Sequence, residues 1–261
     1  MAGKLDARAV LRVVSEVRNS LPPPRPVQVS GALAGVLAKE LGRGAVADAL
    51  RTGGSVEDAA ALVRSLAGPV TEEDERELAA AHRARVPAVA VQTGGEQDES
   101  VPYVLATAVV ACPPGTGFPL ERIARALAAR LSDGDGTAVA ARVPALRPAV
   151  CRNLIRGASV QNGLVGAAVF VPGTDLPVLA LNQLRLVLRL AAAHGLELDR
   201  ERVPEVVALL AGAYGFRAVA RSLLELAPAA GWAVTGAVAY GGTRAIGETA
   251  LRLYERPAGA E

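Results

Sequence analysis

The sequence predicts two domains of different class: an α/β domain with a parallel sheet over residues 1–146, and an all-α, glycine-rich helical domain over residues 147–261. In the first part, short apolar runs alternate with helix-like stretches, which is typical of a parallel sheet with helices on its faces. From about residue 147 the pattern becomes helical, rich in alanine and interrupted by glycines. A length of 261 residues permits one large domain or two small ones, and the composition favours two.

Composition narrows the classes of protein. Hydrophobic residues make up 51% of the chain and aromatic residues only 3%, so the cores must be built from Ala, Val and Leu. A net charge of +2 provides no basic field for nucleic acid. Cys112 and Cys151 are too far apart in sequence to form a metal-ligand motif, and we expect both to be buried in a reducing cytosol. The first 20 residues have no uninterrupted apolar core, so we expect no secretory signal there.

The first strand-like run, residues 26–30, leads through Gly31-Ala32-Leu33-Ala34-Gly35 to a helix-like stretch over 36–41. A nucleotide-binding domain would have its phosphate loop at this place. Such a loop needs glycines, a lysine for the phosphate charge and a hydroxyl for magnesium. The first lysine here is Lys39, too deep in the helix to turn back. The layout of a nucleotide-binding domain is therefore predicted without its phosphate chemistry.

The next elements follow the same alternation. Residues 60–66 are predicted as a strand that ends at Gly68-Pro69. Thr71 and Asp74 have the spacing of a capping box, which predicts a helix from there to about Arg85. The apolar run 86–91 then predicts a buried strand, closed by Gln92-Thr93-Gly94-Gly95.

The last part of this domain is predicted as one more strand and helix. The apolar run 101–111 provides the strand and the turn 113–117 ends it. The following helix has one apolar face, formed by Leu120, Ile123, Leu127 and Leu131.

The stretch 68–93, followed by 101–131, resembles the second half of a small Era-like GTPase domain. The resemblance implies an Asn-Lys-x-Asp motif that reads guanine, but residues 92–95 are Gln-Thr-Gly-Gly. It also implies a magnesium-side Asp-x-x-Gly, whereas Asp48 and Asp58 are followed three residues later by Arg and Ala. The phosphate-loop chemistry, the guanine-reading motif and the magnesium-side motif are thus all missing. This predicts a degenerate GTPase-like sheet, and the alternative is an unrelated small α/β domain.

The second half is similar to the bacterial domain of unknown function that occurs behind small GTPases and in YcjF-type membrane proteins. The similarity lies in several motifs in order, at residues 161–166, 171–177, 181–183, 188–195, 215–221, 228–231 and 239–247. It implies association with GTPase-like domains and often with the bacterial inner membrane. The motif positions of structural or interaction interest are Asn162, Pro172, Gly173, Asp175, Pro177, Asn182, Gln183, Arg217, Arg221, Thr243 and Gly247. Of these, Asp175 is expected to cap a helix that begins near Pro177.

Two windows of this half, residues 157–174 and 226–243, contain no charge, and each has 18 residues. A bilayer-spanning helix needs about 20 apolar residues, so both windows are marginal. Small residues recur every four positions from the second window onward and form a stripe: Ala229, Ala233, Ala237, Gly241 and Ala245. We expect this stripe to pack against Gly163 and Gly166 in a helical hairpin. The hairpin could belong to a water-exposed bundle, a membrane-surface bundle or a membrane insertion.

The sequence indicates no catalytic site. His82 is expected on the polar side of its helix and His194 at a helix C-terminus, both in structural roles. Cys112 follows a strand but has no evident activating base. Arg217 and Arg221 could bind an anionic surface, but glutamates nearby offset their charge.

The predicted function is a non-catalytic interaction or membrane-associated module of a bacterial GTPase-related protein, with its nucleotide site lost and no cofactor. The expected partner is a protein or a membrane surface, not nucleic acid, and the helical domain could form a homo-oligomer. The expected location is the cytoplasm, with a position at or in the inner membrane as the alternative. The alternatives are a nucleotide-binding protein with an atypical phosphate loop, and an integral inner-membrane protein with a helical hairpin.

Overall fold

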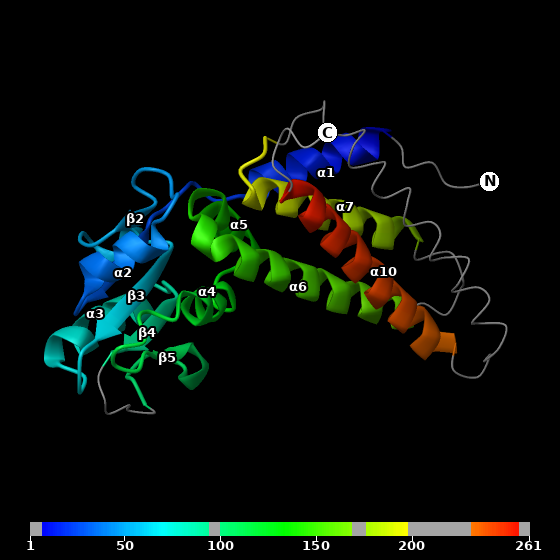
Figure 1. Ribbon diagram of the computed structural model, residues 1–261. Helices are drawn as coiled ribbons and strands as arrows, with labels where there is room; N and C mark the ends of the chain where they lie inside the picture. The colour runs from blue at the N-terminus through cyan, green and yellow to red at the C-terminus, as the bar shows by residue number, and fades with distance from the viewer. Residues whose placement is uncertain (1–6, 94–99, 169–175, 198–230, 256–261) are drawn as a thin grey trace. The chain divides into compact units, whose positions relative to one another are not determined.

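The computed structural model describes residues 7–93, 100–168, 176–197 and 231–255 (Figure 1). The contacts divide the chain into a sheet unit, Leu21–Val150, and a helical unit that joins Met1–Ser20 to Cys151–Glu261. This division falls close to the predicted boundary at residue 146. It differs at the N-terminus, because residues 1–20 group with the helical unit and not with the sheet. The sheet unit is thus inserted, in sequence, between two parts of the helical unit.

The sheet unit is built on five strands that are all parallel, in the order β2-β1-β3-β4-β5. The strands are β1 (Val27–Gly31), β2 (Leu50–Arg51), β3 (Ala61–Leu66), β4 (Ala88–Gln92) and β5 (Val109–Ala111). The predicted α/β class is confirmed. All residues of β3 and β4 are buried, as the continuous apolar runs of central parallel strands require.

The helices of this unit are α2 (Ala34–Leu41), α3 (Glu72–Arg83), α4 (Leu120–Ala128) and α5 (Asp133–Arg142), with short 3₁₀ turns at Val56–Asp58, Ala106–Ala108 and Pro144–Leu146. The chain runs from β1 through α2 to β2 in one direction, and from β3 through α3 to β4 in the other. Because parallel crossovers are right-handed, α2 and α3 cover opposite faces. This doubly wound order reverses between β1 and β3, where such sheets place their ligands.

The α3 face of the sheet has a compact apolar core. Leu62 and Leu66 of β3 meet Leu78 and Ala81 of α3, and all four are at most 2% exposed. The predicted capping box is confirmed, since Thr71 and Asp74 exchange side-chain-to-backbone hydrogen bonds at the start of α3.

The predicted strand over 101–111 is only partly present. Its last three residues form β5, and the residues before them form a turn and a 3₁₀ helix. Val101 is buried, but Tyr103 has a φ of +63°, which no strand residue adopts. Apolar composition therefore predicted burial correctly and strand conformation wrongly.

The described helices of the helical unit are α1 (Ala7–Ser20), α6 (Arg147–Ala168), α7 (Leu176–Ala193) and α10 (Gly231–Tyr254), and the division from the sheet unit falls inside α6. One face of α1 buries its valines, at positions 10, 13, 14 and 17. This spacing of three and four residues forms the apolar stripe that α1 packs against α7.

The expected contact between the two uncharged windows is present, but a different face of α10 makes it. A Cβ atom built on Gly166 of α6 would lie 2.8 Å from Cβ of Ala239 and 2.9 Å from the carbonyl oxygen of Thr235. The predicted stripe is wrong: Ala233, Ala237 and Gly241 are exposed and Ala245 is half-buried, while Ala229 lies outside the described residues. Both faces of α10 have small residues, so residue size alone could not show which one is buried.

None of the helices in the described part of the chain combines the length and the apolar character that a membrane crossing requires.

Candidate functional site

The reversal of strand order directs attention to the turn after β1. Only Ala32 and Leu33 separate the end of β1 from the first residue of α2. Gly31 has a φ of +86°, and a Cβ atom on it would lie 2.1 Å from the carbonyl oxygen of Ser65 in β3. The glycine therefore serves the close approach of β1 to β3. A phosphate loop of the expected type has four residues between its glycines and wraps around the phosphates, and this turn is shorter.

Two backbone groups of this turn form hydrogen bonds within the protein. The backbone N–H of Ala32 donates to the oxygen of Ser65 over 2.9 Å, and the carbonyl of Leu33 accepts from Val36 and Leu37. Lys39 lies in the last turn of α2, as its position in the sequence predicted. In the described part of the chain, the turn has no lysine or hydroxyl that could hold a nucleotide phosphate or its magnesium.

A group of polar side chains lies beside the turn, on the α3 face of the sheet, and is centred on Arg64 of β3, whose Nε would lie 3.1 Å from a Cβ atom on Gly31. Arg64 is 6% exposed and pairs in register with Ser30 of β1. Its Nε and Nη2 each lie 2.6 Å from Oδ1 of Asp74, and its Nη1 donates to Oε2 of Glu77. The guanidinium is thus neutralised by two carboxylates of α3.

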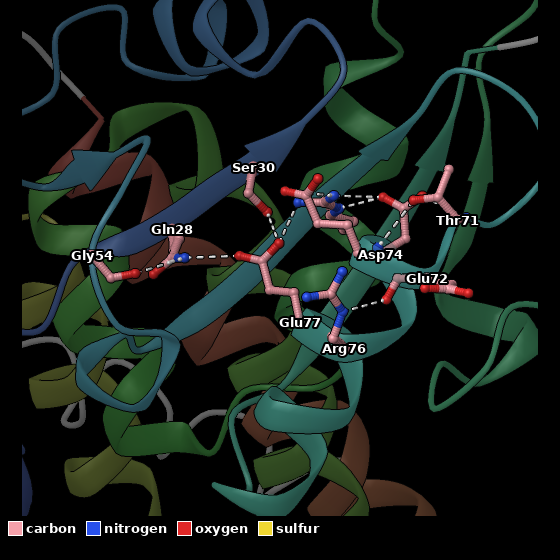
Figure 2. Close-up of polar contacts among 10 residues, drawn as sticks. Gln28, Ser30, Gly54, Thr71, Glu72, Asp74, Arg76 and Glu77 are labelled. Atoms are coloured by element: carbon pink, nitrogen blue, oxygen red, sulfur yellow. Dashed lines mark hydrogen bonds and ion pairs between the residues drawn. The ribbon is translucent and has the colours of Figure 1, made fainter.

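Residues of β1 complete this Arg64 network from the other side (Figure 2). Gln28 donates from Nε2 to Oε1 of Glu77 over 2.9 Å, and the Ser30 hydroxyl donates to Oε2 of Glu77 over 2.7 Å. Gln28 and Ser30 are two residues apart in the strand, so both point to the α3 face. The network joins two strands to one helix.

The electrostatics of the network are those of a structural ion pair. Burial by itself would raise the pKa of Asp74, but hydrogen bonds from Thr71 and from the Arg64 guanidinium outweigh burial and lower it. Asp74 therefore stays ionised and pairs with Arg64, which has no free charge for an anionic ligand.

Sequence reasoning missed this network. The apolar pattern of residues 60–66 predicts the strand but not the partners of Arg64. A charged residue in a buried strand needs a partner, and the acidic first turns of the next helix could have supplied it.

Cys112, His82 and His194 lie where their side chains have structural roles. The thiol of Cys112 donates to the oxygen of Gly117 over 3.1 Å, and burial, together with the charge of Glu40, raises its pKa. It is therefore a protonated, unreactive thiol.

His82 is exposed and packs near Tyr103, with ring centroids 5.5 Å apart. His194 follows the end of α7, where its Nδ1 lies 2.8 Å from the oxygen of Leu190. Within the described ranges, no three acidic, histidine or cysteine side chains are placed to hold a metal.

In the helical unit, four of the predicted motif residues come together from three helices. Asn162 of α6 donates from Nδ2 to Oγ1 of Thr243 of α10 over 2.8 Å. Asn182 of α7 donates to Oδ1 of Asn162 over 2.9 Å, and Gln183 donates to Oγ1 of Thr243 over 3.3 Å. Asn162 and Thr243 are fully buried. We call these four residues the helix polar cluster.

The helix polar cluster continues to α1 through an ion pair. Arg185 donates from Nη1 to Oδ1 of Asn182, and its Nε and Nη2 reach the two carboxylate oxygens of Glu16, all over 3.0 Å. The hydrogen bond from Arg185 lowers the pKa of Glu16. The donors run in one direction from Arg185 to Thr243, whose hydroxyl donates to the oxygen of Ala239 over 2.8 Å. The cluster is saturated and orients helices.

The other predicted motif residues fall into two groups. Gly247 is a point of close approach, since a Cβ atom on it would lie 2.7 Å from Cγ1 of Ile155 of α6. Pro177 is the second residue of α7, consistent with a helix that begins near it. The remaining positions lie outside the described residues: Pro172, Gly173, Asp175, Arg217 and Arg221.

No protein-family model matches this chain, and comparisons with curated proteins and with solved structures found no match either.

Proposed function

We propose that this chain is a non-catalytic interaction module of a bacterial GTPase-related protein, in which the sheet unit keeps the layout of a nucleotide-binding domain without its phosphate site. The observation that carries the proposal is the two-residue turn, Ala32-Leu33, between β1 and α2. It lies at the reversal of strand order, where a doubly wound sheet would bind its ligand. An exposed leucine occupies this turn in place of a phosphate-binding group.

The Arg64 network supports the same proposal. A buried arginine beside the turn would be the natural cation for a phosphate. Here Asp74 and Glu77 bind it from α3, so its charge stabilises the fold. The resemblances of the sequence to Era-like GTPase domains and to YcjF-type domains are consistent with a GTPase-related interaction module.

Calorimetry tests the proposal directly. Titration of the full chain with GTP or ATP and magnesium should give no heat of binding. Micromolar binding that is lost when the Ser30–Gly35 turn is altered would contradict it.

A nucleotide-binding protein with an atypical phosphate loop is the second candidate, and one observation favours it. In the described part of the chain, the backbone N–H groups of Leu33, Ala34 and Gly35 have no acceptor. Free amides at a helix N-terminus attract anions. A titration with inorganic phosphate, followed at these three amides by NMR, separates the candidates because only the second predicts saturable shifts there.

For the helical unit we propose a role at a protein partner or at the cytoplasmic surface of the inner membrane, with a homo-oligomer as a further form. The uncharged windows of α6 and α10 support this, because they expose apolar and small side chains such as Leu164 and Ala237. An integral membrane form would need spans that the described helices do not provide. Separation of cells into soluble, salt-extractable and detergent-extractable pools tests the proposal. Recovery in the detergent pool alone would favour the integral form.

A further inference from the structure

The outer side of α2 exposes large apolar side chains. Leu33, immediately before the helix, is 57% exposed, and Val36, in its first turn, is 51% exposed. They lie three residues apart, so they are neighbours along the helix. Single exposed apolar residues are ordinary on a protein surface, but neighbouring ones can mark a binding surface.

The backbone of Leu33 makes this exposure harder to explain by folding. Its φ is +58° and its ψ is +17°, a left-handed conformation that is unfavourable for a residue with a Cβ atom. Glycine or asparagine would suit this position better and would remove an apolar side chain from water. Tyr103 has a similar φ of +63°, but its ring packs near that of His82. Leu33 is therefore unfavourable for folding in two respects, its left-handed backbone and its exposed apolar side chain. This points to a functional reason for a leucine at this position.

Two exposed cations continue this surface. Lys39 lies one turn after Val36, and Arg43 follows the end of α2. The acidic residue of the same helix, Glu40, is half-buried and close enough to Cys112 for its charge to act on the thiol. The outward side thus combines two apolar side chains with two positive charges. We call Leu33, Val36, Lys39 and Arg43 the α2 face.

We propose that the α2 face docks an acidic amphipathic segment of a partner protein, with Leu33 as the apolar anchor and Lys39 and Arg43 facing its carboxylates. This inference rests on the proposed function, because it names the partner class of an interaction module. Charge complementarity selects an acidic partner, and a few side chains that become well packed carry most of the binding energy of an interface.

A membrane surface would also be attracted by apolar and basic side chains, but the α2 face suits it less. Each cation near an anionic membrane adds only a weak attraction, and lasting attachment needs a larger apolar area or a longer basic run. Two cations and two apolar side chains, on an eight-residue helix and directly beside its ends, fall short of both.

NMR of the ¹⁵N-labelled full chain tests the proposal with two synthetic helical peptides of about 18 residues, or about five helical turns. Both have the same leucine face, and their polar face consists of glutamate in one and lysine in the other. The leucine–glutamate peptide should shift the amides of residues 33–43, and the leucine–lysine peptide should not. The absence of shifts there with the glutamate peptide, or equal binding of both peptides, would overturn the proposal.

Two variants show whether the named side chains carry the binding. Leu33→Gly should leave the protein folded, because glycine suits the positive φ, and should weaken peptide binding at least about tenfold. The separate variant Lys39→Glu should weaken binding of the glutamate peptide and strengthen binding of the lysine peptide. Leu105→Asn is the matched control, since Leu105 is 56% exposed elsewhere on the sheet unit, and it should change nothing. Unchanged binding by Leu33→Gly would overturn the anchor role.

Two further titrations separate this proposal from its alternatives. Phosphatidylglycerol vesicles should not bind through the α2 face, and vesicle binding that Lys39→Glu abolishes, without peptide binding, would assign the face to a membrane. GTP should produce no shifts. Shifts with GTP that persist in Lys39→Glu would contradict the loss of the nucleotide site, while the peptide result would still decide the role of the α2 face.

Discussion

Asn162 and Thr243 are 81 residues apart in the sequence, and the amide of Asn162 donates to the hydroxyl of Thr243 over 2.8 Å in the interior of the helical unit. Neither side chain is exposed to solvent. A buried polar pair of this kind costs free energy unless every donor and acceptor is satisfied. Here the helix polar cluster satisfies them with side chains from α6, α7 and α10. The pair therefore fixes how these helices align.

Replacement of Asn162 by alanine should lower the free energy of unfolding by about 2 kcal/mol, because Nδ2 of Asn182 loses its acceptor and Thr243 loses one of its hydrogen bonds, keeping those to Gln183 and Ala239. Urea denaturation measures this change. Gln161→Ala is the control, since Gln161 is exposed on the same helix and should change stability little. Equal effects of the two substitutions would contradict the role of the cluster. In a double-mutant cycle with Thr243→Val, the two losses should not be additive.

Arg64 should be among the side chains of the sheet unit on which stability depends most. Its replacement by methionine leaves Asp74 and Glu77 without their cation, and loss of one partner of a buried pair typically costs about 3–5 kcal/mol. Thermal or urea unfolding measures the loss. The exposed pair of Arg125 with Glu121 is the comparison, and Arg125→Met should cost less than about 1 kcal/mol. A small effect of Arg64→Met would show that the network is dispensable.

The same network predicts the response to acid. The pKa of Asp74 in the folded protein is lower than its ordinary value of 3.8. Its contribution to stability is therefore fully present above that ordinary value, and is lost as the pH falls through the lower folded pKa. Unfolding followed between neutral pH and pH 2 should show this loss. In Asp74→Asn, stability at neutral pH should be lower and its fall in acid smaller. An unchanged acid profile would contradict the prediction.

Two glycines allow a matched test of helix packing. Gly166→Ala should destabilise the helical unit by about 1–3 kcal/mol, because the new Cβ atom would lie 2.8 Å from Cβ of Ala239. Gly241→Ala should be neutral or stabilising by up to about 1 kcal/mol, since a Cβ atom there meets no atom within 4 Å and alanine favours a helix. Thermal unfolding compares the two variants. If Gly241→Ala destabilised the protein more than Gly166→Ala, the buried face of α10 would be the one with Gly241, as the small-residue stripe predicted.

Local patterns in the sequence predicted the parallel sheet, the Thr71 capping box and the position of Lys39 in the last turn of α2, because each follows from residues close together in the chain. The burial of α10 could not be predicted in this way. Ala237 and Ala239 are equally small, and Ala239 is the one that lies against Gly166 of α6 and is buried. The Arg64 network was missed for a similar reason, since Ser30 and Glu77 meet only once the sheet and α3 are assembled.

The N-terminal helix provides a test of how the two units are built. α1 buries Val10, Val13 and Val17 in the helical unit, and Glu16 forms a two-pronged ion pair with Arg185 of α7. A fragment of residues 151–261 should therefore expose the α1-binding side of α7 and fail to unfold cooperatively. A fragment of residues 21–150 keeps the complete sheet core and should unfold cooperatively by itself. Addition of a peptide of residues 1–20 to the 151–261 fragment should restore helical structure, measured by circular dichroism. Cooperative unfolding of residues 151–261 without the peptide would show that α1 is an accessory of the helical unit.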